Sequence, residues 1–343
     1  MSSHSFSGRA YLRADVSRSL GLGHISRAIA MAMALERQGI HPVILCRILD
    51  YDPGNISRRF SAQRNVIQEI HSEDEFIAIL DREKADYLFI DLLEGPDYVT
   101  LVPRLKSIPS TYRTICFDSF FDKDLMFDVY VGTAVVGSIA HSNSLIGYKY
   151  FICPGDLMPL ATSKETPNEI RRVLITFGGS DPYCITSVVV RILCATHPEI
   201  KFTVVVGPGF TSVERKELLG LAAQHSNMEC ALEPEHLGHL YLASDFAITS
   251  GGLTKFETSL FGIPSFIIAN NQQEEDLSRE FSAFGSSVFM GRADRLDLQR
   301  LIEGFAQLLA QGVRLGEMSR KGRQLLDIYG GERIVAHITK ALS

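Results

Sequence analysis

Short apolar runs alternate with longer amphipathic segments along most of the chain, a pattern typical of parallel α/β proteins. Near the N-terminus, an alternating stretch at 9–16 is followed by a Ser/Gly loop. A helical pattern from Ile25 to Gln38 and an apolar run from His41 to Arg47 come next. This order of strand, loop, helix and strand predicts a βαβ crossover with two parallel strands.

The same alternation continues in two blocks. In the first block we expect further strands at 87–91, 112–118 and 128–132. In the second we expect strands at 172–177, 202–207, 228–232, 246–249 and 265–269, with helical patterns over most of 294–342. Proline and small polar residues interrupt the pattern between the blocks. We therefore predict Rossmann-like domains at 9–153 and 169–343, joined by a linker at 154–168.

Composition narrows the classes of function. The 343 residues are 45% hydrophobic and carry a formal net charge of -6 without a Lys/Arg run, which argues against binding to nucleic acid or to an anionic membrane. The N-terminus has no apolar signal-peptide core, and the six cysteines form no CxxC pair. We expect a cytoplasmic protein with reduced cysteines and without stable membrane insertion; its oligomeric state stays open.

The first glycine loop resembles a dinucleotide-binding fingerprint only in part. Gly21 and Gly23 stand between a strand and a helix, but the third glycine is missing. Arg47 ends the next strand, where NAD enzymes place an acid. An arginine there is compatible with NADP, so an NADP-dependent oxidoreductase is kept as an alternative.

His24 is a candidate general base. It falls in the first turn of the expected helix, where the helix dipole disfavours the imidazolium form. A neutral imidazole beside a ligand site is what base catalysis requires near neutral pH. Arg27 lies three residues further on the same helical face. The alternative is a histidine that caps the loop and an arginine in a salt bridge.

Glycine loops in the second block predict an anion site. Ser250, Gly251 and Gly252 follow a buried strand and expose backbone N–H groups, and Thr254 adds a hydroxyl. Glu257 could accept hydrogen bonds from a ribose diol. A similar loop holds Gly178, Gly179 and Asp181, and two such loops could bind a diphosphate without a metal. The alternative for the Gly251–Gly252 loop is a tight turn with a capping Thr254 and a solvated Glu257.

Other polar residues follow expected strands. Asn271 and Gln272 suit sugar hydroxyls, or an ordinary polar helix start. Asp118 ends a buried strand and is a second candidate catalytic residue. Asp122 and Asp124 follow in an acidic loop that we interpret as solvated, so we expect no metal site there.

Taken in order, these motifs resemble one family. The set is Arg13-Ala14-Asp15, Gly21-x-Gly23-His24-x-x-Arg27, Phe177-Gly178-Gly179-x-Asp181, Gly251-Gly252-x-Thr254-x-x-Glu257 and Asn271-Gln272. It is similar to the nucleotide-sugar hydrolase family of pseudaminic acid biosynthesis, whose relatives include spore-coat polysaccharide proteins and the peptidoglycan N-acetylglucosaminyltransferase.

The resemblance implies a GT-B fold with the active site in the cleft between the two domains. It implies that the second domain binds the UDP part of a nucleotide sugar, and that His24 in the first activates a water to attack the anomeric carbon. It places the diphosphate at Gly251, Gly252 and Thr254, the ribose at Glu257, and sugar or phosphate at Asn271 and Gln272. No metal or other cofactor is implied.

The sequence also departs from the family pattern. Leu92 and Leu93 stand where a His-Tyr or similar pair is usual, and Ser119 stands where a second acid is usual. Both departures fall on the sugar side of the expected site. We predict hydrolysis of a UDP-type amino or deoxy sugar for surface-polysaccharide or nonulosonic-acid biosynthesis. The alternatives are transfer of the sugar to a hydroxyl acceptor, non-catalytic binding of a nucleotide sugar, and the NADP-dependent oxidoreductase.

Overall fold

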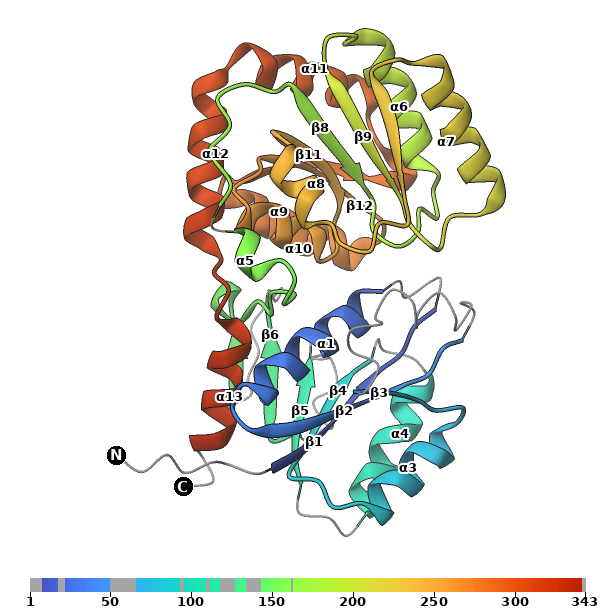
Figure 1. Ribbon diagram of the computed structural model, residues 1–343, viewed down its shortest axis with the longest axis vertical. Helices are drawn as coiled ribbons and strands as arrows, with labels where there is room; N and C mark the ends of the chain where they lie inside the picture. The colour runs from blue at the N-terminus through green and yellow to red at the C-terminus, as the bar shows by residue number, and fades with distance from the viewer. Residues whose placement is uncertain are drawn as a thin grey trace. The chain divides into compact units, whose positions relative to one another are not determined.

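The computed structural model describes residues 8–17, 22–49, 66–92, 96–108, 112–117, 127–133, 143–161 and 163–340, with the side chains of 96–99 left out. The chain divides into two compact units (Figure 1). Unit 1 takes Met1–Gly155 and Ile328–Ser343, and unit 2 takes Asp156–Asp327.

The described part of unit 1 forms a seven-stranded parallel sheet with the order β3-β2-β1-β4-β5-β6-β7. Its strands are β1 (Gly8–Ala14), β2 (Ile40–Cys46), β3 (Ile67–Glu69), β4 (Tyr87–Asp91), β5 (Arg113–Phe117), β6 (Val129–Gly132) and β7 (Ser144–Ile146). Helices α1 (Gly23–Glu36) and α13 (Gly330–Lys340) share one apolar core with the sheet. Helices α3 (Glu73–Arg82) and α4 (Pro96–Ser107) share a second core with it, and η2 (Tyr148–Tyr150) is a short 3₁₀ turn. The two helix pairs thus pack on the sheet through two separate apolar cores, as expected when both faces of a parallel sheet are apolar.

The described part of unit 2 forms a six-stranded parallel sheet with the order β10-β9-β8-β11-β12-β13. Its strands are β8 (Arg172–Thr176), β9 (Lys201–Val206), β10 (Met228–Leu232), β11 (Phe246–Ser250), β12 (Ser265–Ala269) and β13 (Ser287–Arg292). Its helices are α5 (Met158–Ala161), α6 (Ile185–Thr196), α7 (Ser212–Gln224), α8 (Gly238–Ala243), α9 (Thr254–Leu260), α10 (Gln272–Ala283), the 3₁₀ turn η3 (Ala293–Arg295), α11 (Leu298–Ala310) and α12 (Gly312–Leu325). One core joins the sheet to α6, α7, α11 and α12.

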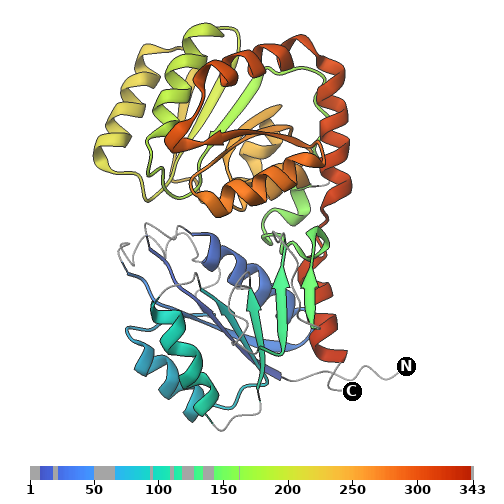
Figure 2. The ribbon, with the colours of Figure 1, turned by 180° about the vertical axis from the view of Figure 1, so that it is seen from behind.

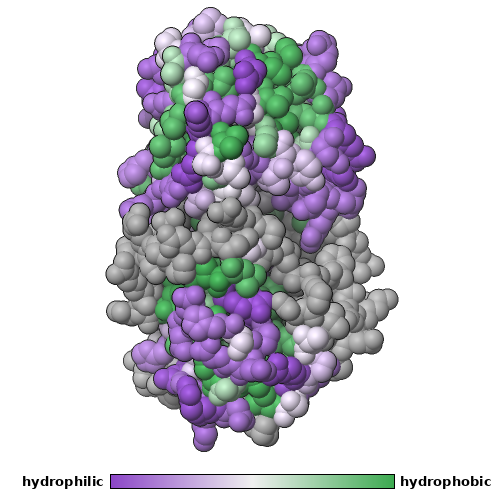
Figure 3. Space-filling model, turned by 90° about the vertical axis from the view of Figure 1, so that its right-hand side faces the viewer, coloured by the Kyte–Doolittle hydropathy of each residue, from purple (hydrophilic) through white to green (hydrophobic). Residues whose placement is uncertain are grey.

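The outer surface of unit 2 is mixed in character. Helix α7 exposes the apolar residues Val213 and Leu219, and Figure 3 shows hydrophobic patches among hydrophilic residues on that side of unit 2. No helix in the described part of the chain is long and apolar enough to cross a bilayer.

The prediction of two Rossmann-like domains with parallel sheets is confirmed. The expected strands are present to within two residues. Strands β3, β7 and β13 were not predicted; the first two have three residues each and lie at the ends of the sheet, where the apolar pattern is weakest.

The units divide the chain differently from the predicted ranges at two places. Helix α13 belongs to unit 1, because Ile334, Val335 and Ile338 enter the core that contains α1 (Figure 1). The segment predicted as a linker contains α5, which belongs to unit 2, where Leu160 lies against Gly238 of α8.

Each of the two described sheets has a switch point, which is the place where the strand order reverses direction. In unit 1 this point lies between β1 and β4, and in unit 2 between β8 and β11. Connections leave the sheet in opposite directions there, so the carboxyl ends of the two strands leave room for a ligand. These two sheet edges hold most of the predicted site residues.

Candidate functional site

A buried ion-pair group occupies the switch point of unit 1. His24 lies in the first turn of α1, which follows β1, and Asp91 ends the neighbouring strand β4, in register with Ala14. The His24 Nδ1 atom lies 2.7 Å from Asp91 Oδ1. The Arg27 guanidinium donates from Nε to Asp91 Oδ2 at 2.7 Å and from Nη2 to Oδ1 at 2.6 Å. One carboxylate therefore fixes both side chains that the sequence singled out on α1.

The charge balance of this group keeps Asp91 ionised. Asp91 is only 3% exposed, and burial alone would raise its pKa. The neighbouring Arg27 guanidinium and the His24 ring outweigh burial and lower the pKa of Asp91 to about 2. Arg27 also lies over the Phe117 ring, 5.4 Å from its centroid, which holds the guanidinium against the carboxylate.

This arrangement gives His24 a defined tautomer. An ionised carboxylate accepts a hydrogen bond, so the Nδ1 atom of His24 carries the proton. No described residue forms a hydrogen bond with Nε2, whose lone pair can therefore accept a proton. The side chain is 14% exposed, which leaves it accessible from solvent. Asp91 therefore orients the His24 ring, a role that the sequence pattern did not indicate for any residue.

Arg13 and Asp15 belong to a buried group of charged side chains. Arg13 is fully buried and donates to Asp15 at 2.8 and 3.0 Å and to Glu73 at 2.6 Å. Arg47 lies 3.5 Å from Asp15 and 3.4 Å from Glu73. These four side chains form an ion-pair network that ties the ends of β1 and β2 to the start of α3. Arg47, the residue that the NADP alternative needs, is thus engaged by two carboxylates.

The Gly178–Gly179 loop of unit 2 leaves β8 at the switch point. Gly178 has a φ of +89°, a conformation that side chains with a Cβ disfavour, so the sharp turn requires glycine. Asp181 is 2% exposed and accepts the backbone N–H groups of Ile185 and Thr186 at 3.1 and 2.7 Å. Burial raises the pKa of Asp181. Asp181 therefore accepts the first N–H groups of α6.

The second glycine loop leaves the adjacent strand β11. A Cβ on Gly251 would lie 2.8 Å from the Cβ of Glu274 and 2.9 Å from Ser278 Oγ, so the close packing of α10 requires glycine. Thr176 and Thr249 are in register on the two strands, so the glycine loops that follow them start side by side. The structure therefore brings together the two amide-rich turns that the sequence proposed as one diphosphate site.

Two features beneath these loops were missed in the sequence. Lys255 is 2% exposed and donates from Nζ to the carbonyl oxygen of Gly251. The hydroxyls of Thr176 and Thr249 are buried without a hydrogen-bond partner among the described residues, an arrangement that costs about 1–3 kcal/mol per group. In the sequence, these features could have been noticed only as a lysine in the first turn of α9 and as a threonine near the end of β8 and of β11.

Ser250, Thr254 and Glu257 surround the Gly251–Gly252 loop. Ser250 and Thr254 are buried, with 5% and 8% exposure. Glu257 is half-buried in the first turn of α9, and its Oε2 accepts the hydroxyl of the buried Tyr241 at 2.5 Å. Tyr241 thus fixes the carboxylate that was predicted to bind a ribose.

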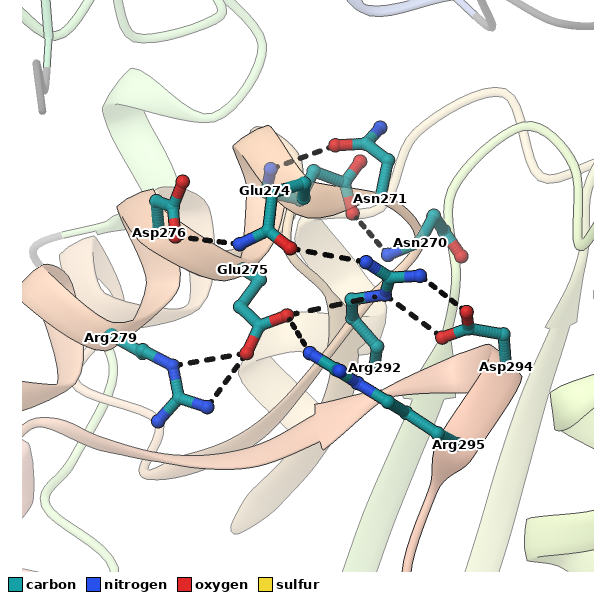
Figure 4. Close-up of polar contacts among 10 residues, drawn as sticks. Asn270, Asn271, Glu274, Glu275, Asp276, Arg279, Arg292, Asp294 and Arg295 are labelled. Carbon is teal, nitrogen blue, oxygen red and sulfur yellow. Dashed lines mark hydrogen bonds and ion pairs between the residues drawn. The ribbon is translucent and has the colours of Figure 1, made fainter.

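Gln272 is the first residue of α10, and Asn271, labelled in Figure 4, precedes it at the N-cap position after β12. Asn271 caps the helix, since its Oδ1 accepts the N–H of Glu274 at 2.8 Å. Gln272 accepts from Arg292 at 3.2 Å and donates to Asp276 at 2.9 Å. Both side chains lie on the exposed surface at the carboxyl end of β12.

Glu275 connects this helix start to its neighbours. It is 3% exposed, with Arg279 at 2.7 Å and Arg295 at 2.6 Å, and Arg292 lies at the edge of the same group (Figure 4). The two ion pairs with Arg279 and Arg295 lower the pKa of Glu275. The sequence pattern did not single out this cluster.

Some predicted residues lie outside the described part of the chain. They are Gly21, Asp118, Leu93, Ser119, Asp122 and Asp124. Leu92 is described and is buried in the core shared with α3 and α4. Within the described ranges, no three His, Cys, Asp or Glu side chains are grouped as they would be around a metal ion.

Comparison with known proteins identifies distant relatives. No protein-family model matches the chain. It is 23% identical over 277 residues to an uncharacterized protein of Methanocaldococcus jannaschii; the match covers 76% of this chain but only 56% of that longer protein. It is 20% identical over 337 residues to the spore coat polysaccharide biosynthesis protein SpsG of Bacillus subtilis, over 94% of this chain and 95% of SpsG.

Solved structures give the fold. The UDP-GlcNAc 2-epimerase of Neisseria meningitidis bound to UDP-GlcNAc matches 97% of this chain and 100% of its own, with 12% identity and a TM-score of 0.66. The match to MurG of Acinetobacter baumannii covers 97% of this chain and 99% of MurG, with 14% identity and a TM-score of 0.65. Together with the two parallel sheets, these likenesses confirm the predicted GT-B fold.

Proposed function

We propose that the protein is an enzyme that breaks the anomeric C–O bond of a UDP-sugar and transfers the sugar to an oxygen nucleophile in polysaccharide biosynthesis. The observation that carries this proposal is the His24–Asp91 pair, with Nδ1 held at 2.7 Å and Nε2 without a described partner. Such a pair is suited to accept a proton from a hydroxyl group.

In the proposed step, Nε2 of His24 takes the proton of the attacking hydroxyl. The hydroxyl oxygen forms the new bond to the anomeric carbon, and the bond from that carbon to the diphosphate oxygen breaks. The electron pair of the broken bond leaves with UDP. Asp91 stabilises the imidazolium that forms, and Arg27 keeps Asp91 ionised and in position.

Unit 2 is proposed to bind the nucleotide. The backbone N–H groups of the Gly178–Gly179 and Gly251–Gly252 loops would meet the diphosphate, and they would also stabilise the charge that develops on it. Glu257, already oriented by Tyr241, would accept the ribose hydroxyls. The names of the similar proteins support a UDP-sugar, since one of the structures contains UDP-GlcNAc.

Transfer to a hydroxyl acceptor is the activity we favour, because the relative SpsG is named for polysaccharide biosynthesis and the departures at Leu92 and Leu93 weaken the match to the hydrolases. Hydrolysis is the second candidate. It is favoured by the ordered motif set, and it needs only water in place of the acceptor.

Release of UDP from a panel of UDP-sugars tests the proposal, with and without candidate hydroxyl acceptors. Transfer predicts UDP release that depends on an acceptor. Equal release without any acceptor would establish hydrolysis instead. UDP-sugar binding without any product would contradict both activities and favour a binding protein.

A further inference from the structure

A basic groove lies beside the edge strand β13 of unit 2, with a volume of about 460 Å³. Figure 2 shows this orange strand among α10, α11 and α12. The groove is lined by Arg279 of α10, Arg300 of α11, and Arg314 and Lys321 of α12. A second hollow of about 170 Å³ shares Arg300 and Arg314 with it, so the two adjoin.

The charges in the groove are not balanced. Its lining holds four basic side chains and one acidic side chain, Glu317, and one of the basic side chains, Arg279, is paired with Glu275 outside the lining; the remaining positive charge stands in a chain whose formal net charge is -6. The side chains of Arg314 and Lys321 form no hydrogen bond or ion pair with any described residue. Concentrated positive charge on an acidic protein raises the free energy of the empty groove and favours an anion in it.

Two of the arginines are held in place. The Arg300 Nη2 atom donates to the carbonyl oxygen of Phe289 at 3.0 Å. The Arg279 guanidinium lies over the ring of the same phenylalanine, 4.8 Å from its centroid, and pairs with Glu275. Less side-chain entropy is therefore lost when a ligand binds to them. Lys321 reaches across the turn at Gly285, at the start of β13.

The groove is separate from the candidate nucleotide site. It follows Ser287 to Phe289, the amino-terminal half of β13, whereas the glycine loops leave the carboxyl ends of β8 and β11. We propose that this groove binds a phosphate-bearing ligand with at least two negative charges. Arginine guanidinium groups match phosphate oxygens in geometry and charge. This proposal does not depend on the proposed enzymatic activity.

The phosphate could belong to a soluble molecule or to a lipid headgroup, and the chemistry of recognition is the same. Phe284 and Val313, which are 45% and 85% exposed, adjoin groove residues in the sequence. Exposed apolar side chains beside basic ones are a feature of membrane-surface contacts. The test therefore needs one arm for each source.

The first arm is calorimetric titration with pyrophosphate at about 0.15 M salt. Excess UDP is present so that the proposed nucleotide site is filled. The double variant Arg314→Gln/Lys321→Gln should bind pyrophosphate about tenfold more weakly than the wild type, because two charge-assisted contacts are lost. The matched control is Arg320→Gln, an exposed arginine on the same helix that does not line the groove; its affinity should change by less than about twofold.

The second arm measures sedimentation with phosphatidylcholine vesicles, with and without phosphatidic acid. Loss of vesicle binding in the double variant but not in Arg320→Gln supports a headgroup ligand, and loss of pyrophosphate binding supports a soluble one. If the double variant matches the wild type in both arms, or if the wild type binds neither probe, the proposal is wrong. The comparison stands even if UDP does not bind, since Arg314 and Lys321 lie away from the glycine loops.

Discussion

The two sheets present different chemistry at their switch points. In unit 1, the end of β4 holds Asp91, and the start of α1 brings polar atoms of His24 and Arg27 within 2.7 Å of its carboxylate oxygens. In unit 2, the corresponding edge is formed by glycine loops, and the polar side chains beside them cap helices or form ion pairs. We propose that the same topology serves proton transfer at the edge in unit 1 and recognition of an anion by backbone amides at the edge in unit 2.

The largest effect should come from the base. His24→Gln keeps a polar side chain of similar size but cannot accept a proton near neutral pH. We expect turnover to fall by about 10²–10⁴-fold, with UDP affinity unchanged. The measurement is UDP release under saturating sugar nucleotide, beside calorimetry with UDP.

His71→Gln is the control for that variant, since the His71 side chain is 77% exposed and lies between β3 and α3 rather than on α1. It should retain full turnover. If His24→Gln keeps activity within a few-fold of the wild type, the assignment of the base is wrong.

The second effect concerns the glycine loop. In Gly251→Ala the new methyl group would lie within 2.8 Å of Glu274, so the loop or α10 must shift. We expect UDP to bind about tenfold more weakly and the free energy of unfolding to fall by about 1–3 kcal/mol. Calorimetry and urea denaturation measure the two quantities.

Gly220→Ala provides a matched substitution in the same unit, because no atom lies within 4 Å of the added Cβ. It lies in helix α7 and should slightly raise stability without changing UDP affinity. Unchanged UDP affinity in Gly251→Ala would separate this loop from nucleotide binding.

A smaller effect is expected at Glu257. Glu257→Gln keeps an oxygen that can accept the Tyr241 hydroxyl but removes the charge that strengthens bonds to a ribose diol. UDP affinity should fall by about three- to tenfold, and turnover at saturation should change little. Glu280→Gln, at an exposed position on α10, should bind UDP like the wild type. Equal affinities in the two variants would refute the ribose role.

The smallest effect is in the pH dependence of stability. The pKa of Asp91 falls from 3.8 to about 2 on folding, so its stabilising contribution is complete above pH 3.8 and is lost as the pH falls towards 2. Urea denaturation of the wild type and Asp91→Asn from pH 4 to pH 2 should give a stability difference that shrinks as the pH falls. A difference that does not shrink over this range would contradict the ion pairing of Asp91.

The fold could be predicted because strands buried on both faces of a parallel sheet are continuous apolar runs, as at Tyr87–Asp91 and Ser265–Ala269. The place of α13 could not be predicted in the same way. Its amphipathic pattern shows that it packs on a sheet, but the pattern does not say which sheet it covers.

The candidate site could be predicted where a motif is local and not where a partner is distant. His24 and the glycine loops follow strands directly. Asp91 lies 67 residues from His24 in the sequence, and only the pairing of β1 with β4 brings the two together. Arg13 and Asp15 form the first motif of the family set, and the structure buries both side chains in an ion-pair network with Glu73, a partner that the motif does not contain. A role of these two residues in substrate binding stays a prediction.

The central claim is that Asp91 acts on the reaction through His24. The measurement that tests it most directly is a double-variant cycle of turnover with His24→Gln, Asp91→Asn and both changes together. We expect that Asp91→Asn alone lowers turnover by about 10²–10³-fold, and that the double variant is no slower than His24→Gln. If the two losses instead multiply in the double variant, Asp91 acts independently of His24 and the proposed role of Asp91 is wrong.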